Sequence, residues 1–224
     1  MMFIFLQQQS FSLLSMAAKG GWLMIVLALL SIVAIYVFTE RFLTLRKASK
    51  VDTSFVKDVK DYILSGKVRS AKALCRQNGT PVARMIEKGV NLIDHPVSDI
   101  QAAMENVAAM EIAKMERRIP ILSTIAGGAP MIGFLGTVMG MVQAFFNMSN
   151  AGNNVDISLL SGGIYTAMIT TVGGLIVGIL AYFANNFLSS RIDDLEAKMQ
   201  TVMVYILDVA RFRNENNSDN GNQD

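Results

Sequence analysis

The chain has 224 residues, a formal net charge of +2 and hydrophobic residues at 52% of its positions, with a mean hydropathy of +0.38. It is too apolar for an ordinary soluble domain, and a charge so near neutral gives no indication of nucleic-acid binding. The single cysteine, Cys75, excludes a disulfide framework and a thiolate zinc site. We therefore expect a membrane protein with no cofactor, no metal and no nucleic-acid partner.

Three stretches lack charged side chains over lengths that cross a bilayer. No Asp, Glu, Lys or Arg occurs from Gly20 to Thr39, and Asp156 is the only one from Pro120 to Ser190. A spanning helix needs about 20 mostly apolar residues. A polar loop at 147–156 divides the second block. We predict an all-α integral membrane protein with transmembrane helices at 20–40, 120–146 and 157–188. Buried helices of a soluble protein are the alternative, but such long runs are rare there.

The segment before the first span is apolar but lacks the basic start of a secretory signal peptide. We predict a short interfacial helix over residues 1–19. Within the first span only Ala28, Ser31 and Ala34 are small, and the other side chains are bulky. Close packing against another helix needs small residues, so we expect this span to face membrane lipid.

Residues 41–119 have the pattern of a domain of short helices. Helix breaks are expected at Gly66, at Asn78–Gly79 and at His95–Pro96. Thr80 and Pro81 are suited to the N-cap and the first turn of the helix after the second break. Ser98 can cap the long helix that follows the third.

Two long helices are expected to extend the second and third spans. Apolar residues recur in steps of four and three before the second span and after the third (Ala108, Ile112, Met115, Ile119, Leu122 and Ala126; Leu188, Ile192, Leu195, Met199, Val202, Ile206 and Val209). Heptads favour a helical partner, so we predict an unbroken helix entering the second span and pairing of the two extensions. Amphipathic surface helices are the alternative. The second extension is predicted at 189–213, followed by a disordered polar tail at 214–224.

Lys and Arg set the expected orientation. Of the 20 present, 15 lie between Arg41 and Arg118 and four follow Ser190, whereas the 147–156 loop has none. The positive-inside rule places residues 41–119 and the C-terminus in the cytoplasm, and the N-terminus and the 147–156 loop in the periplasm. The rule is strongest for short loops, but the charges of 41–119 cluster at both of its ends.

The second and third spans both carry a stripe of small residues (Ala129, Gly133, Gly136, Gly140 and Ala144; Gly163, Ala167, Thr170, Gly174, Gly178 and Ala181). In lipid, small residues permit the close approach on which helix association depends. We predict that five of these glycines pack helices together in an assembled bundle or ring (Gly133, Gly136, Gly140, Gly174 and Gly178). Pro130 lacks an N–H and should kink the second span.

No Asp, Glu, Lys, Arg or His lies within a span. A proton relay normally needs an ionisable group at membrane depth, so any titrating group must come from another chain. The polar candidates for lining an ion path are Thr137, Thr166, Thr170 and Thr171. For each one, a hydrogen bond back to its own helix is the alternative.

Three segments resemble one known family. Residues 130–146 (PMIGFLGTVMGMVQAFF) resemble the second-span signature of the ExbB/TolQ/MotA proton-channel family, and 163–186 (GIYTAMITTVGGLIVGILAYFANN) resemble its third span. The cytoplasmic LCRQNGTPVARMIEKGV (74–90) is also similar. The GTV-x-G element is the most specific of these motifs, and the likeness is closest to ExbB and TolQ.

This resemblance implies a homopentamer in the bacterial inner membrane, with the second and third spans around a central pore. It further implies an ExbD/TolR-like partner, a single-span protein whose membrane Asp lies in that pore, and a TonB-like protein that passes the work to the outer membrane. The implied coupling ion is H⁺. Thr137 and Thr171 match the family's pore threonines.

One position departs from the family pattern. Many members carry Glu five residues before the third-span threonine, where this chain has Thr166. A lining carboxylate on this subunit is therefore missing, and oxygen ligands from threonine would also suit Na⁺.

Four roles remain open: an ExbB-like subunit serving TonB-dependent transport, a TolQ-like subunit for envelope maintenance, a gliding or flagellar-type stator, and a structural scaffold without ion flow. Stator relatives tend to have four spans, which counts against that role. An enzyme is not expected, because no catalytic constellation is present and the lone His95 precedes a proline.

Overall fold

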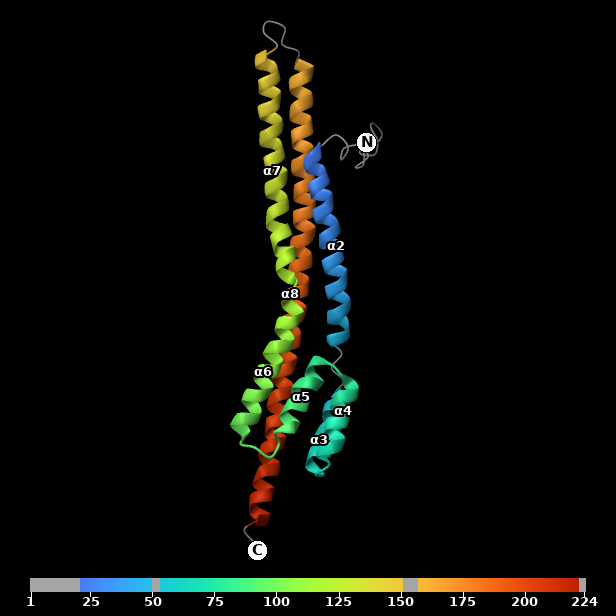
Figure 1. The fold of residues 1–224 in the computed structure, drawn as a ribbon, viewed down its shortest axis with the longest axis vertical. Coiled ribbons are helices and arrows are strands. Elements are labelled where there is room, and N and C mark those ends of the chain that lie inside the picture. Colours follow the sequence, from blue (N-terminus) through green and yellow to red (C-terminus); the bar gives the residue numbers. More distant parts are fainter. Residues whose placement is uncertain (1–20, 50–52, 151–156, 222–224) are drawn as a thin grey trace, which may run out of the picture. The chain divides into compact units, whose positions relative to one another are not determined.

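The computed structural model describes residues 21–49, 53–150 and 157–221 (Figure 1), and all regular structure in these ranges is helical. The helices are α2 (Trp22–Ala48), α3 (Thr53–Leu64), α4 (Val68–Asn78), α5 (Pro81–Asn91), α6 (Val97–Glu116), α7 (Ile119–Asn150) and α8 (Ile157–Gly221). The all-α prediction is confirmed for these residues. The interfacial helix predicted at 1–19 and most of the 147–156 loop lie outside them.

Three helical stretches are long and apolar enough to cross a membrane, and they overlap the three predicted spans (Trp22–Ala48, Val97–Asn150 and Leu160–Arg213). The chain divides into two compact units. Unit 1 comprises Met1–Phe38 and Ile119–Asn186, and unit 2 comprises Thr39–Arg118 and Phe187–Asp224. Helices α2 and α8 each contribute to both units.

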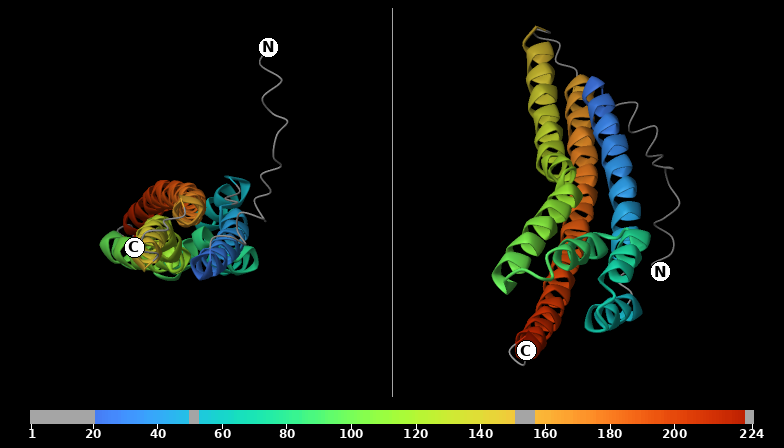
Figure 2. Two further views of the ribbon diagram at one scale, coloured as in Figure 1. Left: turned by 90° about the horizontal axis from the view of Figure 1, so that it is seen from above. Right: turned by 60° about the horizontal axis from the view of Figure 1, so that its bottom comes forward.

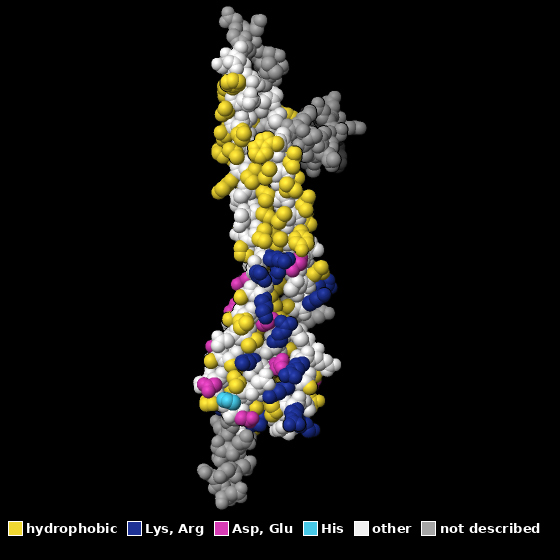
Figure 3. Space-filling view, viewed as in Figure 1, with side chains coloured by type: hydrophobic (Ala, Val, Ile, Leu, Met, Phe, Trp, Pro, Cys, Tyr) yellow, Lys and Arg dark blue, Asp and Glu magenta, His cyan; other side chains and the backbone are white. Residues whose placement is uncertain are grey.

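Unit 1 is a packed group of three apolar helices, α2, α7 and the first part of α8 (Figure 2). Leu27, Ile125, Ala129 and Ala181 form its buried centre, with one residue or more from each helix. The opposite face of α2 carries large apolar side chains that are more than half exposed (Trp22, Ile25, Leu29, Ile32, Ile35 and Tyr36). Figure 3 shows hydrophobic side chains spread over the visible face of this unit. An apolar surface of this extent suits lipid as its solvent.

Unit 2 is a helical domain in which α3 packs on α4, α4 on α5 and α5 on α6. The predicted breaks are confirmed: Gly66 and Gly79 adopt the left-handed conformation, with φ of 74° and 63°. Thr80 Oγ1 accepts the N–H of Ala83 at 3.3 Å, and Pro81 opens α5. Ser98 does not cap α6, because the helix begins one residue earlier, at Val97, with Pro96 at the N-cap.

The heptad predicted on the last helix is its buried face. Leu188, Ile192, Leu195, Met199, Ile206 and Val209 are all buried, whereas Val202 is half-buried and its neighbour Met203 is buried. Helix α8 ends at Gly221 and not at 213 as expected. Residues 214–220 contain no Gly or Pro, and a helix already formed propagates easily until such a stop. Pairing of the two extensions stays a prediction.

The prediction of one unbroken helix entering the second span is wrong. Helix α6 ends at Glu116 and α7 begins at Ile119, with a turn at Arg117 and Arg118. Pro120 is the cause, because it lacks the N–H that would bond the Glu116 carbonyl and its ring crowds that carbonyl. Arg117 keeps helical dihedrals, so the interruption is local. The boundary between the two units falls at the same point.

A side chain of α2 caps the end of α6 beside this turn. Arg41 is 8% exposed, and its Nη1 donates to the carbonyls of Lys114 at 3.1 Å and Met115 at 3.3 Å. Its Nε pairs with Glu40 at 2.9 Å, and Glu40 also pairs with Arg118 at 3.4 Å. Cations are favourable at a helix C-terminus, so Arg41 ties α2 to α6.

Candidate functional site

The two small-residue stripes face each other within one chain, where α7 and α8 approach closely in unit 1. A Cβ added to Gly133 would lie 2.9 Å from the Thr170 carbonyl oxygen, and one on Gly140 would lie 2.6 Å from the Ala167 Cβ. Gly136 lies against the Thr170 side chain in the same way. Real Cβ atoms essentially never come this close, so only glycine fits at these points.

The contact continues toward the other end of the helix pair. A Cβ on Gly174 would lie 2.5 Å from the Ala129 carbonyl oxygen, and one on Gly178 would lie 2.5 Å from the Pro130 ring. Helix α7 runs through Pro130, whose missing N–H leaves the Ala126 carbonyl without its usual partner. That oxygen lies 3.1 Å from the Cβ position of Gly178. The glycine stripes are therefore accounted for inside the chain, and they no longer argue by themselves for a ring.

Three of the four candidate threonines donate their hydroxyl hydrogens to main-chain carbonyls. Thr171 Oγ1 donates across the helix pair to Gly133 at 2.9 Å. Thr170 Oγ1 donates to Ala167 at 2.7 Å, and Thr137 Oγ1 donates to Phe134 at 2.6 Å. A carbonyl oxygen has no hydrogen to give, so the threonine must be the donor in each pair. Each hydroxyl is left with lone pairs only.

The four threonines differ in exposure. Thr170 is 2% exposed inside the α7–α8 contact, whereas Thr137, Thr166 and Thr171 are half-buried and keep an accessible side. Thr171 contacts α7 at Gly133, and Thr137 follows Gly133 by four residues, which is about 6 Å along the helix. Accepting hydroxyl oxygens therefore occur on both helices of an otherwise apolar pair.

The sequence did not indicate that the Gly133 carbonyl serves as the acceptor for Thr171. Glycine in both stripes signalled a close approach, but a stripe does not identify which carbonyl becomes accessible. Within the described residues, no group of three or more His, Cys, Asp or Glu side chains gathers to hold a metal ion. The described part of unit 1 contains no ionisable Asp, Glu, Lys, Arg or His at all.

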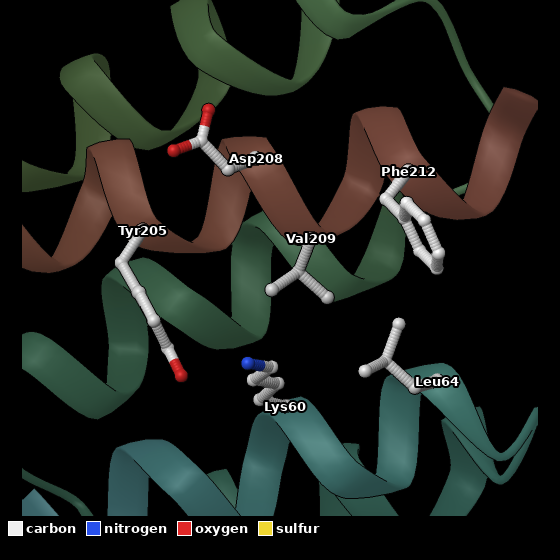
Figure 4. Close-up of a pocket in the computed structure, with 6 residues that line it drawn as sticks. All are labelled: Lys60, Leu64, Tyr205, Asp208, Val209 and Phe212. Atoms are coloured by element: carbon white, nitrogen blue, oxygen red, sulfur yellow. The ribbon is translucent and has the colours of Figure 1, made fainter.

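Unit 2 offers a different kind of surface. A groove between α3 and α8 is lined by Lys60 and Leu64 of α3 and by four residues of α8, which are Tyr205, Asp208, Val209 and Phe212 (Figure 4). The Lys60 Nζ lies 5.2 Å from the centre of the Tyr205 ring, within range of a cation–π interaction.

Fold and site together define a class: a helical membrane protein whose described apolar spans carry accepting hydroxyl oxygens but no Asp, Glu, Lys, Arg or His. Comparison with known proteins agrees with this class. Residues 77–201 match the MotA/TolQ/ExbB proton channel family. The chain belongs to this family.

Curated relatives carry both ExbB and TolQ names. A putative biopolymer transport protein ExbB homolog of Methanothermobacter thermautotrophicus is 31% identical over 192 residues, which cover 85% of this chain and 68% of the relative. The putative biopolymer transport protein ExbB-like 1 of Synechocystis sp. is 31% identical over 73% of this chain and 65% of its own length. The Tol-Pal system protein TolQ of Haemophilus influenzae is 38% identical over 94 residues, 42% of this chain and 41% of the relative.

Proposed function

We propose that this chain is an ExbB-like subunit of an ion-driven motor in the bacterial inner membrane. In this proposal it assembles as a homopentamer around a single-span partner of the ExbD/TolR type, whose membrane Asp carries the coupling ion. Ion flow then acts on a TonB-like protein to energise transport across the outer membrane. In this proposal the coupling ion is H⁺, and Na⁺ is the alternative.

One observation supports the proposal: the described spans have hydroxyl oxygens that can accept hydrogen bonds, but they have no Asp or Glu side chain. The described spans contain no Asp, Glu, Lys, Arg or His, so in this proposal the chain does not itself pass a proton from group to group. Thr137 and Thr171 have committed their hydrogens to Phe134 and Gly133. Their lone pairs can accept a hydrogen bond from a protonated carboxyl or from water, or ligate Na⁺, but they cannot donate to a carboxylate.

This chemistry assigns each subunit a role. A charged group at the bilayer centre costs at least about 2.5–3.5 kcal/mol. A lining that only accepts hydrogen bonds favours the neutral, protonated form of a carboxyl over its charged form. In our proposal the partner's Asp is therefore protonated while it faces these threonines, and it releases its proton where it meets water. The chain surrounds the titrating group and does not titrate.

A TolQ-like role in envelope maintenance is the second candidate, because a TolQ protein is among the relatives. The site chemistry is the same for both roles, and they differ in the protein that receives the work. Loss of TonB-dependent uptake on deletion would favour the ExbB-like role. A leaky outer membrane with normal uptake would favour the TolQ-like role.

The test replaces both half-buried threonines by their isostere without a hydroxyl. Thr137→Val with Thr171→Val should spare assembly but reduce partner-dependent ion flux in vesicles by about tenfold per lost hydrogen bond, or more. Thr137→Ser with Thr171→Ser keeps both hydroxyls and should be milder.

Thr124→Val and Thr201→Val are matched controls. The Thr124 hydroxyl donates to the Pro120 carbonyl at 2.9 Å, and the Thr201 hydroxyl donates to the Ala197 carbonyl at 2.9 Å. Both bonds are within their own helices, and neither involves Gly133, Thr137 or Thr171. Full flux in the double valine variant would reduce Thr137 and Thr171 to packing groups. Equal losses in the controls would point to helix stability and not to the ion path.

Thr166→Glu tests the departure from the family pattern. It places a carboxylate on α8 one turn before Thr170, where many family members carry Glu. If the accepting lining works with the partner's Asp alone, Thr166→Glu should leave assembly intact and make flux more dependent on pH. Loss of assembly would mean that this position is packed against apolar side chains of another subunit.

A further inference from the structure

An open pocket of about 430 Å³ in unit 2 has no role in the function proposed above. Side chains from α2, from the start of α5 and from α6 line it, among them Thr44, Lys47, Thr80, Arg84, Glu111 and Lys114. The residues come from segments far apart in the sequence, so the folded domain is needed to build the pocket.

The charges in this pocket do not balance. Glu111 is buried, with 6% of its side chain exposed, and it pairs with Arg84 at 2.6 Å and with Lys114 at 2.5 Å. Arg84 and Lys114 are themselves more than half exposed, so both keep donors free for a further anion. Lys47 adds a third cation. Three cations against one carboxylate leave an excess positive charge around the cavity.

Helix ends reinforce this positive field. Helix α5 starts at the pocket, and a helix N-terminus favours anions. The carbonyl ends that border the same pocket already have donors. Gly79 N–H bonds the Cys75 carbonyl at 3.2 Å, and Arg41 bonds the carbonyls of Lys114 and Met115. The negative ends of α4 and α6 are thus partly neutralised. At the positive end of α5, Thr80 Oγ1 accepts the Ala83 N–H at 3.3 Å.

We propose that this pocket binds a phosphate group, either as free phosphate or as the headgroup of an anionic phospholipid. A phosphate offers several strong acceptor oxygens, and Arg84, Lys47 and Lys114 offer donors of the matching charge. The cavity is large enough for a phosphodiester with a small polar substituent.

The position of Lys47 along α2 makes the lipid source reachable. The last residue of the charge-free stretch of α2 is Thr39, and a helix rises about 1.5 Å per residue, so Thr44 follows by about 8 Å and Lys47 by about 12 Å. The headgroup layer is about 5–8 Å thick on each side of the hydrocarbon. A lysine side chain extends toward that layer while its backbone lies below it. This step requires only that α2 crosses the membrane, and it is independent of ion conduction.

The experiment uses the full chain in two settings. Inorganic phosphate is titrated against the protein in detergent, followed by phosphorus NMR. Separately, retained lipid is counted by native mass spectrometry after transfer from nanodiscs of phosphatidylglycerol or of phosphatidylcholine. Phosphate binding in detergent assigns a soluble anion, and selective retention of phosphatidylglycerol assigns the headgroup.

Three variants test how binding changes when one charge is removed. Lys47→Gln should weaken binding about threefold, the effect expected for one exposed ion pair. Glu111→Gln removes the competing carboxylate and should strengthen binding by a similar factor. Lys57→Gln makes the same charge change on the exposed face of α3, outside the pocket, and should leave binding unchanged.

Several results would overturn the proposal. One is no binding of either ligand to the natural chain. Another is an equal loss in Lys47→Gln and Lys57→Gln, which would mean general surface attraction. Weaker binding in Glu111→Gln would mean that the carboxylate holds the pocket open and does not compete. Thermal unfolding of each variant separates these readings from loss of the fold.

Discussion

The described residues of unit 1 carry no charged side chain, whereas unit 2 carries all seven ion pairs found among the described residues. Unit 1 brings α7 and α8 together through glycine, so that backbone meets backbone. Unit 2 buries large side chains such as Ile63, Met85 and Met104. The difference follows from the solvent: lipid gives helices no hydrophobic reason to associate, and water does.

The same contrast separates the two candidate sites. In unit 1 the polar atoms are hydroxyl oxygens held by main-chain carbonyls, which suits the proposed ion path whose titrating group belongs to another chain. In unit 2 the polar atoms are charged groups at the edge of a pocket, which suits an anion from water or from the headgroup layer. Each of the following changes tests one side of this comparison.

The largest effect is expected at a glycine of the α7–α8 contact. Gly174→Ala places a Cβ 2.5 Å from the Ala129 carbonyl oxygen and 2.9 Å from the Gly133 Cα, and backbone atoms cannot move aside cheaply. Overpacking of this kind costs about 1–3 kcal/mol, and Gly174→Leu should prevent folding. Unfolding in mixed micelles measures the change.

Gly128→Ala is the matched control, because a Cβ there meets nothing within 4 Å. It should stabilise α7 by up to about 1 kcal/mol, since alanine is the better helix former. If Gly128→Ala instead destroys the oligomer seen by native mass spectrometry, Gly128 lies at a contact between subunits. If Gly174→Ala is harmless, the close approach within the chain is wrong.

In unit 2 the largest single side-chain effect is expected at Arg41. Arg41→Met keeps the length but removes both hydrogen bonds to the end of α6 and the ion pair with Glu40. We expect a loss of about 2 kcal/mol, because buried acceptors are left without donors. Arg46→Met, on the exposed side of the same helix, should cost less than about 0.5 kcal/mol. Equal effects would show that charge, and not the cap on α6, matters.

A smaller effect is expected at the start of α5. Thr80→Ala removes the hydroxyl that accepts the Ala83 N–H, and such N-caps contribute about 1 kcal/mol. Ser98→Ala is the control, because Ser98 lies inside α6 and caps nothing, so its effect should be within about 0.5 kcal/mol. Chemical denaturation of the two variants side by side gives the difference. A larger loss at Ser98 would contradict the observed start of α6.

The smallest effect concerns Cys75 and serves as the background for a topology test. Burial first, and the charge of Glu87 second, raise the pKa of Cys75 from 9.0 to about 12, so its thiol stays neutral and unreactive. The pKa of Cys75 is higher in the folded chain than in the unfolded chain. The neutral thiol therefore contributes fully to stability below about pH 9, and this contribution is lost as the pH rises toward about 12.

The natural chain should therefore resist thiol reagents, because Cys75 is buried. A cysteine introduced at Asn153 should react with an impermeant reagent in spheroplasts, and one at Asn216 should not, if the C-terminus is cytoplasmic. The opposite labelling pattern would reverse the orientation.

Local chemistry made much of this fold predictable. Charge-free runs located the three apolar helices, because an unpaired charge in lipid is costly. Gly66, Gly79 and Thr80 marked helix ends because left-handed backbone and N-caps depend on the residue itself. The heptad from Leu188 to Val209 identified the buried face of α8, since burial repeats with the helical period.

Relations between distant residues were not predictable in the same way. The stripes of α7 and α8 were expected to pack, but the sequence did not say that they pack on each other within one chain. The Thr171–Gly133 hydrogen bond joins residues 38 positions apart, and it depends on how two helices are rotated against each other. A helical wheel shows which side chains share a face of one helix, but it does not show how two helices are rotated against each other. The pocket around Glu111 was missed for the same reason.

The central claim is that this chain surrounds the ion path while another chain carries the titrating group. The most direct measurement is ion flux in proteoliposomes under an imposed proton or sodium gradient, with the chain alone, with its single-span partner, and with the partner's membrane Asp changed to Asn. The account predicts flux only when the unaltered partner is present. Equal flux from the chain alone, or full flux with the Asn partner, would contradict it.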